Sequence, residues 1–239
     1  MCCGRRPAAS EVLPTLVLLP GLDGTGRLFT ALIGALPAGT RAIPVSYAQR
    51  ERATLPELVA EVRSALPPEP YLLVAESFSG PVAIALAASA PPGCAGVVLV
   101  ATFRRHPLRV PRWASALVTP VLARIPPPRW LLRWALVGRD AEPALVAALS
   151  AAIASVPPAV LAGRLRLLNG VDAGSALRQV QLPVLYLRAT QDRVVPAFNA
   201  RDLARLCPAM QIAAVRGPHL LLQRRPVEAL SVIAAWCTR

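Results

Sequence analysis

A serine at the end of an apolar run is the first residue in this chain whose surroundings suit covalent chemistry. Ser77 lies in the segment AESFSG (75–80), which follows the apolar run YLLVA and precedes the helix-like stretch PVAIALAAS. A nucleophilic serine on a sharp turn between a strand and a helix needs small residues two positions to either side. Ala75 and Ser79 meet this need, whereas Ser79 as nucleophile would place Pro81 at one of these positions. The pattern favours Ser77 as nucleophile, and the alternative without chemistry is a serine-rich turn that caps a helix.

The two histidines of the sequence differ in how well they are placed to serve this serine as a base. A serine hydroxyl is a weak nucleophile unless a neighbouring base removes its proton. His219 lies in the loop 217–220, directly after the last apolar run of strand length, whereas His106 follows the run at 96–102 and would place the base before the acid along the chain. Sites of parallel sheets form outside the carboxyl ends of the strands. His219 is therefore the favoured base, and a structural histidine is the alternative at either position.

A carboxylate is needed to hold the tautomer of the histidine and to stabilise its protonated form. Asp192 lies in the loop that directly follows the strand-like segment PVLYLR (183–188), whereas Asp140 and Asp172 lie in a stretch without strand ends to fix them. We therefore expect Asp192 to be the acid, with an aspartate that caps a helix beyond Pro196 as the structural alternative. The chain order of serine, aspartate and histidine belongs to one of the known convergent arrangements of these groups.

A glycine-rich loop follows the first apolar run, in the segment LVLLPGLDGTGRLF (16–29). The spacing of Gly21 and Gly26 follows the phosphate-binding pattern GxxxxGK[ST] up to its last two positions. Arg27 stands there in place of the lysine, and Leu28 in place of the hydroxyl residue that holds magnesium. A nucleotide site is therefore disfavoured.

The same loop suits a charge that develops on a substrate carbonyl during nucleophilic attack. The run before the loop should lie beside the nucleophile strand, so the backbone N–H of Leu22 can point at the carbonyl oxygen. The backbone N–H of Phe78, directly after the nucleophile, would be the second donor. Gly21 leaves room for a close approach of the backbone. We therefore expect an oxyanion hole built from Leu22 and Phe78.

Apolar runs of strand length alternate with helix-like segments along most of the chain. The runs are rich in Val, Leu and Ile and lie at 12–19, 42–47, 71–75, 96–102, 183–189 and 210–215. Helix-like spacing is found at 55–66, 80–90 and 197–206. This alternation predicts a class α/β fold, with a mostly parallel sheet of about six strands that helices cover on both faces.

One stretch breaks the alternation and is expected to be a helical insertion. Residues 104–180, called the insert below, contain no convincing strand but several short helical pieces separated by prolines. The insert has eleven arginines against three acidic residues, a formal charge of +8, and three of the four tryptophans, which are Trp113, Trp130 and Trp134. We therefore expect residues 1–103 and 181–239 to form the core and the insert to form a lid.

The composition and charge argue for a globular domain without a nucleic-acid module. Of the 239 residues, 54 % are hydrophobic and 16 % are charged, which is enough apolar surface to form a large core. The net charge is +13 and every one of the 26 basic residues is arginine, but the arginines occur singly or in pairs. Scattered charge of this kind, without interleaved aromatics, is typical of solvated surface, so no nucleic-acid partner is expected.

The cysteines indicate the redox state of the compartment, and the apolar segments indicate whether the chain could span a membrane. The five cysteines form no C-x-x-C pair and have no metal-like spacing with histidine, so we expect a reducing, cytoplasmic compartment and no metal. The segment MCCGRRPAASEV has no apolar stretch typical of a signal peptide. The uncharged residues 77–103 are broken by Ser-Gly-Pro and Pro-Pro-Gly, so no transmembrane segment is expected.

Four segments together resemble the α/β-hydrolase superfamily over nearly the whole chain. They are LLPGLDGTG, AESFSG, ATQDRVVP and GPHLLLQ, in the order that the superfamily has. The set is similar to a group of small bacterial carboxylesterase-like hydrolases, with PGLDG in place of a His-Gly oxyanion motif, and to esterase, lipase, thioesterase and phytyl-ester-synthase proteins. The resemblance implies the family strand order 4-3-5-6-7-8, without the first two strands. Ala75 and Ser79 depart from the two glycines of G-x-S-x-G.

These observations lead to the hypothesis of a serine hydrolase that acts on an ester or thioester with a hydrophobic acyl group, without cofactor or metal. The substrate would be a small or lipid-like ester, and the charge of the insert would suit an anionic acyl carrier or head group. An acyltransferase that uses the same three side chains with an alcohol as acceptor is one alternative. A non-catalytic binding protein on the same fold is the other.

Overall fold

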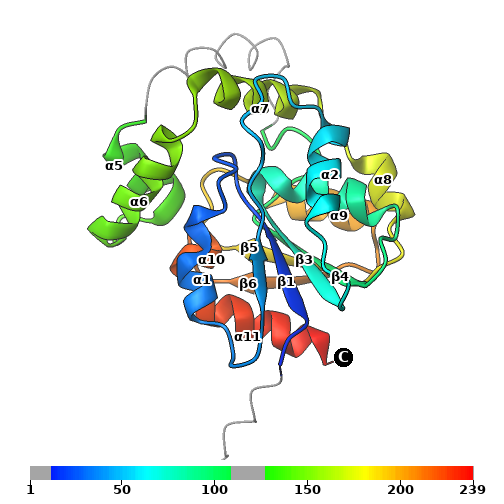
Figure 1. Ribbon diagram of the computed structural model, residues 1–239. Coiled ribbons are helices and arrows are strands. Elements are labelled where there is room, and N and C mark those ends of the chain that lie inside the picture. Colours follow the sequence, from blue (N-terminus) through cyan, green and yellow to red (C-terminus); the bar gives the residue numbers. More distant parts are fainter. Residues whose placement is uncertain (1–11, 109–126, 239) are drawn as a thin grey trace, which may run out of the picture.

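A computed structural model describes residues 12–108 and 127–238, which are arranged around one parallel sheet (Figure 1). The sheet has six strands in the order β2-β1-β3-β4-β5-β6, and all neighbouring strands are parallel. The strands are β1 (Thr15–Leu19), β2 (Ala42–Pro44), β3 (Tyr71–Glu76), β4 (Cys94–Val100), β5 (Val184–Ala189) and β6 (Gln211–Val215). The predicted sheet and its strand order are therefore confirmed.

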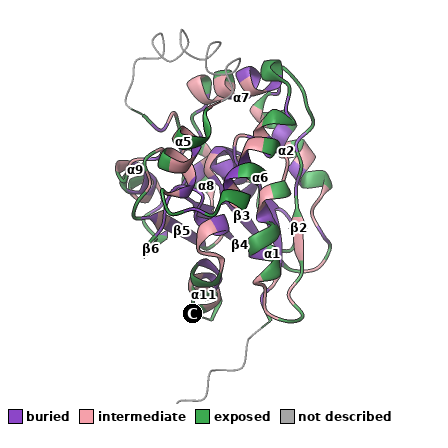
Figure 2. Cartoon of the chain, turned by 90° about the vertical axis from the view of Figure 1, so that its left-hand side faces the viewer, coloured by how far each residue is buried: buried purple, intermediate pink, exposed green. Residues whose placement is uncertain are grey.

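The central strands are continuous apolar runs because both of their faces are buried. Every residue of β1 and β3 is buried, whereas β2 and most of β6, at the two edges, are partly exposed. Successive side chains of a strand point to opposite faces, and β1 divides accordingly: Leu16 and Leu18 pack into one core cluster, and Val17 and Leu19 into the other. Figure 2 shows this buried material at the centre of the molecule.

Two layers of helices cover the sheet. On one face lie α2 (Leu55–Ser64), α3 (Gly80–Ala87), α8 (Gly174–Gln179) and α9 (Phe198–Leu206). On the other face lie α1 (Thr30–Gly34), α10 (Leu221–Arg224) and α11 (Pro226–Cys237), and a short 3-10 turn, η1 (Arg27–Phe29), precedes α1. The predicted helices at 55–66, 80–90 and 197–206 correspond to α2, α3 and α9. Helix α2 begins at a capping box in which Thr54 and Glu57 bond reciprocally.

The described part of the insert is helical, apart from one isolated bridge between Arg105 and Asp172. It contains α5 (Arg129–Leu132), the π-helical turn η3 (Arg133–Val137), α6 (Pro143–Ala154), α7 (Pro158–Gly170) and α8. Both α6 and α7 begin with a proline, which is favoured there because the first helical N–H needs no partner within the helix. Trp113 and the rest of 109–126 lie outside the described residues, and the predicted limits of the insert stay a prediction.

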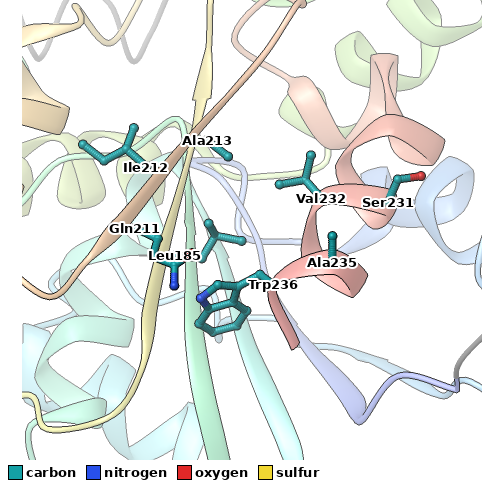
Figure 3. A pocket seen from close by; sticks show the side chains of 8 residues that line it. All are labelled: Leu185, Gln211, Ile212, Ala213, Ser231, Val232, Ala235 and Trp236. Atoms are coloured by element: carbon teal, nitrogen blue, oxygen red, sulfur yellow. The ribbon is translucent and has the colours of Figure 1, made fainter. Parts of the chain in front are cut away.

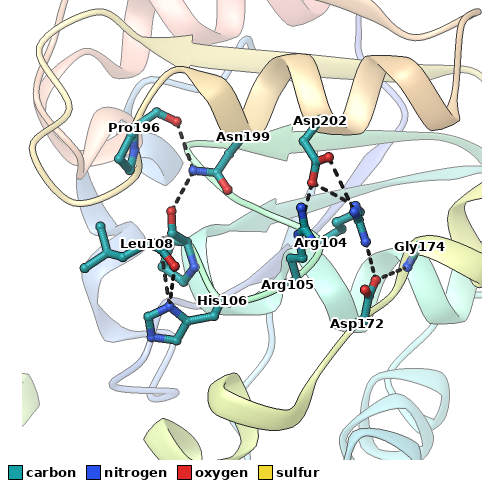
Figure 4. Close-up of polar contacts among 10 residues, drawn as sticks. Arg104, Arg105, His106, Leu108, Asp172, Gly174, Pro196, Asn199 and Asp202 are labelled. Carbon is teal, nitrogen blue, oxygen red and sulfur yellow. Dashed lines mark hydrogen bonds and ion pairs between the residues drawn. The ribbon is translucent and has the colours of Figure 1, made fainter. Parts of the chain in front are cut away.

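Ion pairs join the two ends of the insert to the core (Figure 4). The Arg104 guanidinium lies 2.5 Å from Asp172 Oδ1 and 2.9 Å from Asp202 Oδ2, in helix α9. Arg105 also contacts Asp202, at 3.5 Å. The buried Asn199 side chain donates hydrogen bonds to backbone carbonyls on either side of it. The start and the end of the insert are therefore fixed to each other and to α9.

The helices were also compared with the requirements of a membrane span. Among the described residues, no single helix is both long and apolar enough to cross a bilayer. Helices α6 and α7 meet the criterion only when taken together, across a bend of 92°.

Candidate active site

Ser77 lies on a strained turn between β3 and α3. Its φ is +51°, in the left-handed region that L-residues other than glycine rarely adopt, and the 3-10 turn η2 (Ser77–Ser79) leads from it into α3. The Thr102 hydroxyl donates a hydrogen bond to the Ser77 carbonyl. A Cβ at Gly80 would lie 2.0 Å from Thr102 Oγ1, so this glycine is needed for the turn and the strand end to approach. The turn therefore presents a half-buried serine at the carboxyl end of β3.

Three side chains from distant parts of the sequence form a hydrogen-bonded row. His219 Nε2 lies 2.9 Å from Ser77 Oγ, and His219 Nδ1 lies 2.9 Å from Asp192 Oδ2. The side chains of His219 and Asp192 are only 3 % and 5 % exposed. The structure thus brings together the three residues that sequence reasoning selected for catalysis, and their catalytic roles stay a prediction.

The hydrogen bonds of Asp192 determine which nitrogen of His219 accepts a proton. Asp192 Oδ1 accepts from the backbone N–H groups of Val194 and Val195, both at 2.8 Å. Asp192 Oδ2 faces Nδ1, and a carboxylate can only accept, so Nδ1 carries the proton of a neutral imidazole. Nε2 then has its lone pair toward the Ser77 hydroxyl, which is the arrangement that general-base catalysis requires.

The alternatives that sequence reasoning left open are not brought to this row. The Ser79 hydroxyl is buried and donates to the carbonyl of Pro20. His106 is half-buried, and its ring bonds to the backbone of Leu108, two residues further on (Figure 4). Asp140 and Asp172 form ion pairs with arginines elsewhere. The geometry therefore leaves one set of serine, histidine and aspartate side chains in mutual contact within the described residues.

The glycine-rich loop that contains Leu22 is held through its backbone carbonyls. The Gly24 N–H donates to Gly21 O at 3.0 Å, which closes a tight turn, and the Tyr47 N–H donates to Gly24 O at 2.8 Å. The predicted strand 42–47 ends at Pro44, because the chain leaves the sheet there to make this contact. The Asp23 carboxylate accepts from Thr25, within the loop itself. These bonds fix the loop beside the serine turn.

Sequence reasoning missed two side chains that also hold this loop. Tyr47 is buried, and its hydroxyl bonds to Ser79, next to the nucleophile turn. Arg164 of α7 is 2 % exposed and donates to the carbonyls of Leu22 and Asp23. Neither side chain stands in a motif, so the sequence offers no signal for them beyond residue type.

A buried carboxyl group lies next to Ser77 in the chain. Glu76 is 1 % exposed, and Gln223 Nε2 donates to its Oε2 at 3.0 Å. Burial raises the pKa of Glu76 from 4.5 to about 7, because the charged form loses its hydration, and the bond from Gln223 and the proximity of His219 offset only part of that effect. A titratable group therefore lies directly behind the row of Ser77, His219 and Asp192.

The insert contacts the loops of both Asp192 and His219 through backbone carbonyls of η3. Arg193 Nη1 donates to Trp134 O at 2.6 Å, and its guanidinium lies 5.0 Å from the centre of the Trp134 ring. The N–H of Leu220 donates to Leu136 O at 2.9 Å. A π-helical turn is frequent at functional sites, and here its carbonyls accept from the residues that follow the acid and the base.

Two pockets differ in their position relative to the row of Ser77, His219 and Asp192. The larger, about 390 Å³, lies between β6 and α11, away from the strand ends that hold the row, and no titratable side chain lines it (Figure 3). The smaller is a crevice between the serine turn, α3 and α7, which is closed in the structure and has no room for a water molecule. Its lining is apolar throughout and consists of Leu55, Phe78, Pro81, Val82, Leu167, Leu168 and Val171.

Comparisons with known proteins agree with this architecture. Residues 14–224 match the family model described as alpha/beta hydrolase fold. An esterase from Thermogutta terrifontis has a similar structure (TM-score 0.77, 19 % identity, 96 % of this chain and 91 % of that chain covered). An enol-lactonase from Burkholderia xenovorans (0.75, 18 %, 95 % and 92 %) and a hydrolase from Oleispira antarctica (0.76, 13 %, 95 % and 93 %) are similar as well. At these identities the structures bear on the fold alone. No curated protein matches the sequence.

Proposed function

The chain belongs to the alpha/beta hydrolase fold family, and on this premise we propose that it is a serine hydrolase that cleaves a carboxylic ester or thioester. The observation that carries the proposal is the row in which His219 lies 2.9 Å from both Ser77 Oγ and Asp192 Oδ2. The position of Ser77 on a turn with φ of +51° supports it, because such turns expose a nucleophile at the top of the sheet.

The proposed reaction has two steps that share one covalent intermediate. Ser77 Oγ attacks the substrate carbonyl carbon while His219 Nε2 takes the hydroxyl proton, and Asp192 stabilises the imidazolium. The bond to the leaving alcohol or thiol breaks, His219 returns the proton to it, and an acyl group remains on Ser77. Water, activated by the same imidazole, then attacks this ester and releases the acid. No cofactor takes part in the proposed steps.

The oxyanion of each tetrahedral intermediate would be bound by the backbone N–H groups of Leu22 and Phe78. In a trans peptide the C=O and the following N–H point in opposite directions. Since Gly21 O faces the Gly24 N–H inside the turn, the N–H of Leu22 points out of the turn. A donor of this kind contributes about 3 kcal/mol to the stability of the transition state. The proposal assigns this contribution to the backbone and not to the leucine side chain.

A hydrophobic acyl group is the proposed substrate specificity. The apolar side chains that close the crevice beside Phe78 are proposed to move apart and receive the acyl chain, since they offer no polar partner to a hydrophilic group. Three of these residues belong to α7 and the turn that follows, so the insert would act as a lid over a core of residues 1–103 and 181–239. The formal charge of +8 on the insert would favour an anionic head group or acyl carrier.

The test is a series of chromogenic esters with increasing acyl length, assayed on the wild type and on Ser77→Ala. We expect turnover to rise with chain length and to be lost in Ser77→Ala, while Ser231→Ala, an exposed serine of α11, retains full activity. Asp192→Asn should lower kcat by about 10³- to 10⁴-fold. Equal turnover by the wild type and Ser77→Ala would refute the proposal.

Two further readouts separate the alternatives. Addition of a long-chain alcohol tests whether the acyl-enzyme passes its acyl group to an alcohol instead of water, which would identify an acyltransferase. Labelling with a fluorophosphonate tests the nucleophile itself, because the reagent forms a covalent adduct only with an activated serine. A folded protein without an adduct on Ser77 would instead be a binding protein on this fold.

A further inference from the structure

Arg164 is a fully buried arginine from the insert that contacts the proposed oxyanion loop. It lies in α7, is 2 % exposed, and is the largest of the fully buried side chains among the described residues. Its Nη1 donates to Leu22 O at 3.1 Å and to Asp23 O at 2.5 Å. Both acceptors are backbone carbonyls of the loop whose Leu22 N–H is the proposed oxyanion donor.

The charge of Arg164 is not neutralised by an ion pair. Within residues 12–108 and 127–238, no carboxylate forms a salt bridge with it, and its partners are the two carbonyls and the Tyr47 ring, whose centre lies 6.0 Å from the guanidinium carbon. Burial lowers the pKa of Arg164, yet an arginine remains charged in proteins. The carboxylates of Asp23 and Glu61 favour this charge only from beyond salt-bridge distance, and a buried charge without a directly bonded carboxylate costs folding free energy.

The loop is shaped to receive this guanidinium. Gly24 has φ of +64°, and a Cβ there would lie 2.5 Å from Arg164 Nη1. Any larger residue at this position would therefore displace the guanidinium as well as strain the backbone. The space that the glycine leaves is filled by the arginine.

Arg164 completes the set of bonds that fix this loop. Every carbonyl from residue 20 to residue 24 has a hydrogen-bond partner: the Ser79 hydroxyl, the Gly24 N–H, Arg164 twice, and the Tyr47 N–H. Arg164 supplies two of these five bonds, and they lie on the two carbonyls that directly follow the Leu22 N–H. Without them, the Leu22 and Asp23 carbonyls would lose these bonds, and the bond from the Gly24 N–H to Gly21 O and that from the Tyr47 N–H to Gly24 O would remain on that side of the donor.

We infer that Arg164 is a positioning residue, which holds the Leu22 N–H in the direction required to bind the oxyanion and so makes the insert part of the catalytic framework. The inference rests on the proposed function, because it assigns a role within that reaction. Arg164 touches neither Ser77 nor His219 in the structure, so it acts through the loop. Removal of its bonds should therefore affect the transition state more than the bound substrate.

The test compares Arg164→Met, which keeps the apolar stem of the side chain without its donors, with Arg164→Lys and with Arg166→Met. Arg166 lies in the same helix, is exposed, and donates to the carbonyl of Glu51, outside the catalytic loops. The substrate is the chromogenic ester that the wild type turns over best. We expect Arg164→Met to lower kcat about 10- to 100-fold with a change in KM of less than about threefold. The kcat of Arg164→Lys should lie between those of Arg164→Met and the wild type, and the kcat of Arg166→Met should match that of the wild type.

A pair of inhibitors distinguishes positioning from a general loss of structure. An alkyl trifluoromethyl ketone adds to Ser77 and forms an oxyanion, whereas the corresponding secondary alcohol binds without one. Arg164→Met should weaken the ketone by the same factor as kcat/KM and leave the affinity for the alcohol unchanged. If Arg164→Met fails to fold, Arg164→Lys provides the same comparison.

The outcomes separate this inference from the proposed function. Wild-type kcat and ketone affinity in Arg164→Met, in a protein whose Ser77→Ala variant is inactive, would overturn the inference alone. An equal loss of ketone and alcohol affinity would also overturn it, because it would indicate a damaged pocket. Retained activity in Ser77→Ala would overturn the proposed function, and the inference with it.

Discussion

The hydroxyl groups of Tyr47 and Ser79 lie 2.6 Å apart, and the direction of their hydrogen bond follows from the next partner. Ser79 donates its only hydrogen to the carbonyl of Pro20, so Tyr47 must be the donor to Ser79. Ser79, two positions after Ser77, thus connects Tyr47 with Pro20, at the start of the proposed oxyanion loop. Burial raises the pKa of Tyr47, which keeps the donor protonated at neutral pH.

Substitutions at this pair should impair catalysis through the loop. Ser79→Ala removes the bond to Pro20 O, and we expect kcat to fall about tenfold, the effect of losing roughly 1.4 kcal/mol of alignment. Ser79→Gly introduces the residue that the G-x-S-x-G pattern has at this position. It should show the same loss of kcat, because the missing hydroxyl and not the size of the residue causes the loss. Tyr47→Phe should have a smaller effect. Steady-state kinetics on all three variants provide the measurement, and full activity in Ser79→Gly would contradict the expectation.

Gly24→Ala and Gly39→Ala form a matched pair for the role of the loop. Both glycines have positive φ, +64° and +84°, so either substitution should lower the free energy of unfolding by about 1–2 kcal/mol. Only Gly24 lies against Arg164, whereas Gly39 lies near Val12, in the loop before β2. We therefore expect Gly24→Ala alone to lose activity, at least tenfold in kcat. Chemical denaturation and kinetics on both variants test this, and equal activity in the two would speak against a role for the guanidinium contact.

The raised pKa of Glu76 predicts a stability that falls as pH rises. A carboxyl whose pKa increases on folding, here from 4.5 to about 7, binds more protons in the folded than in the unfolded state between these values. Its contribution is fully present below about pH 4.5 and is lost by about pH 7, a change on the order of 3 kcal/mol. Glu76→Gln should remove this slope, and the exposed Glu228→Gln should retain it. Urea denaturation from pH 4.5 to 8 is the measurement; the same slope in Glu76→Gln and the wild type would contradict it.

The ion pairs at the base of the insert should matter more than those on the open surface. The Arg104 side chain is 13 % exposed and bonds to Asp172 and Asp202, whereas Arg41 is 66 % exposed and bonds to Glu69. We expect Arg104→Met to lower the free energy of unfolding by about 2 kcal/mol, since it removes the 2.9 Å partner of the partly buried Asp202 and leaves that carboxylate only the longer contact with Arg105. Arg41→Met should cost less than about 1 kcal/mol. Thermal denaturation of the two variants at equal ionic strength is the measurement. Equal losses of stability would contradict the expectation that the less exposed ion pair contributes more.

The fold could be predicted because its strands are buried on both faces. A strand such as Tyr71–Glu76 is apolar from Tyr71 to Ala75, and its helical neighbours have a different period, so the order of elements can be read from the sequence. The predicted α/β-hydrolase fold and family resemblance are confirmed. Ser77, Asp192 and His219 could be selected for a related reason: the carboxyl ends of parallel strands lie at one edge of the sheet, so residues that follow different strands meet.

Arg164 and Tyr47 could not be identified in this way. Arg164 is one of eleven arginines in the insert, and residue type gives no indication that this one is buried while its neighbour Arg166 is exposed. Tyr47 is the last residue of an apolar run and has the pattern of a strand end. The roles of both depend on how α7 and the loop after β2 pack over residues 20–24, and such packing between distant segments has no periodic signal in the sequence.

The insert makes hydrogen bonds with three loops around the row. Arg164 donates to the Leu22 loop, and the carbonyls of Trp134 and Leu136 accept from the loops that contain Asp192 and His219. A chimera that exchanged this segment for that of another hydrolase would therefore have to reproduce all three contacts as well as a new acyl site. Directed evolution of substrate range in this scaffold should accordingly accept changes on the solvent side of α6 more readily than wholesale replacement of the segment.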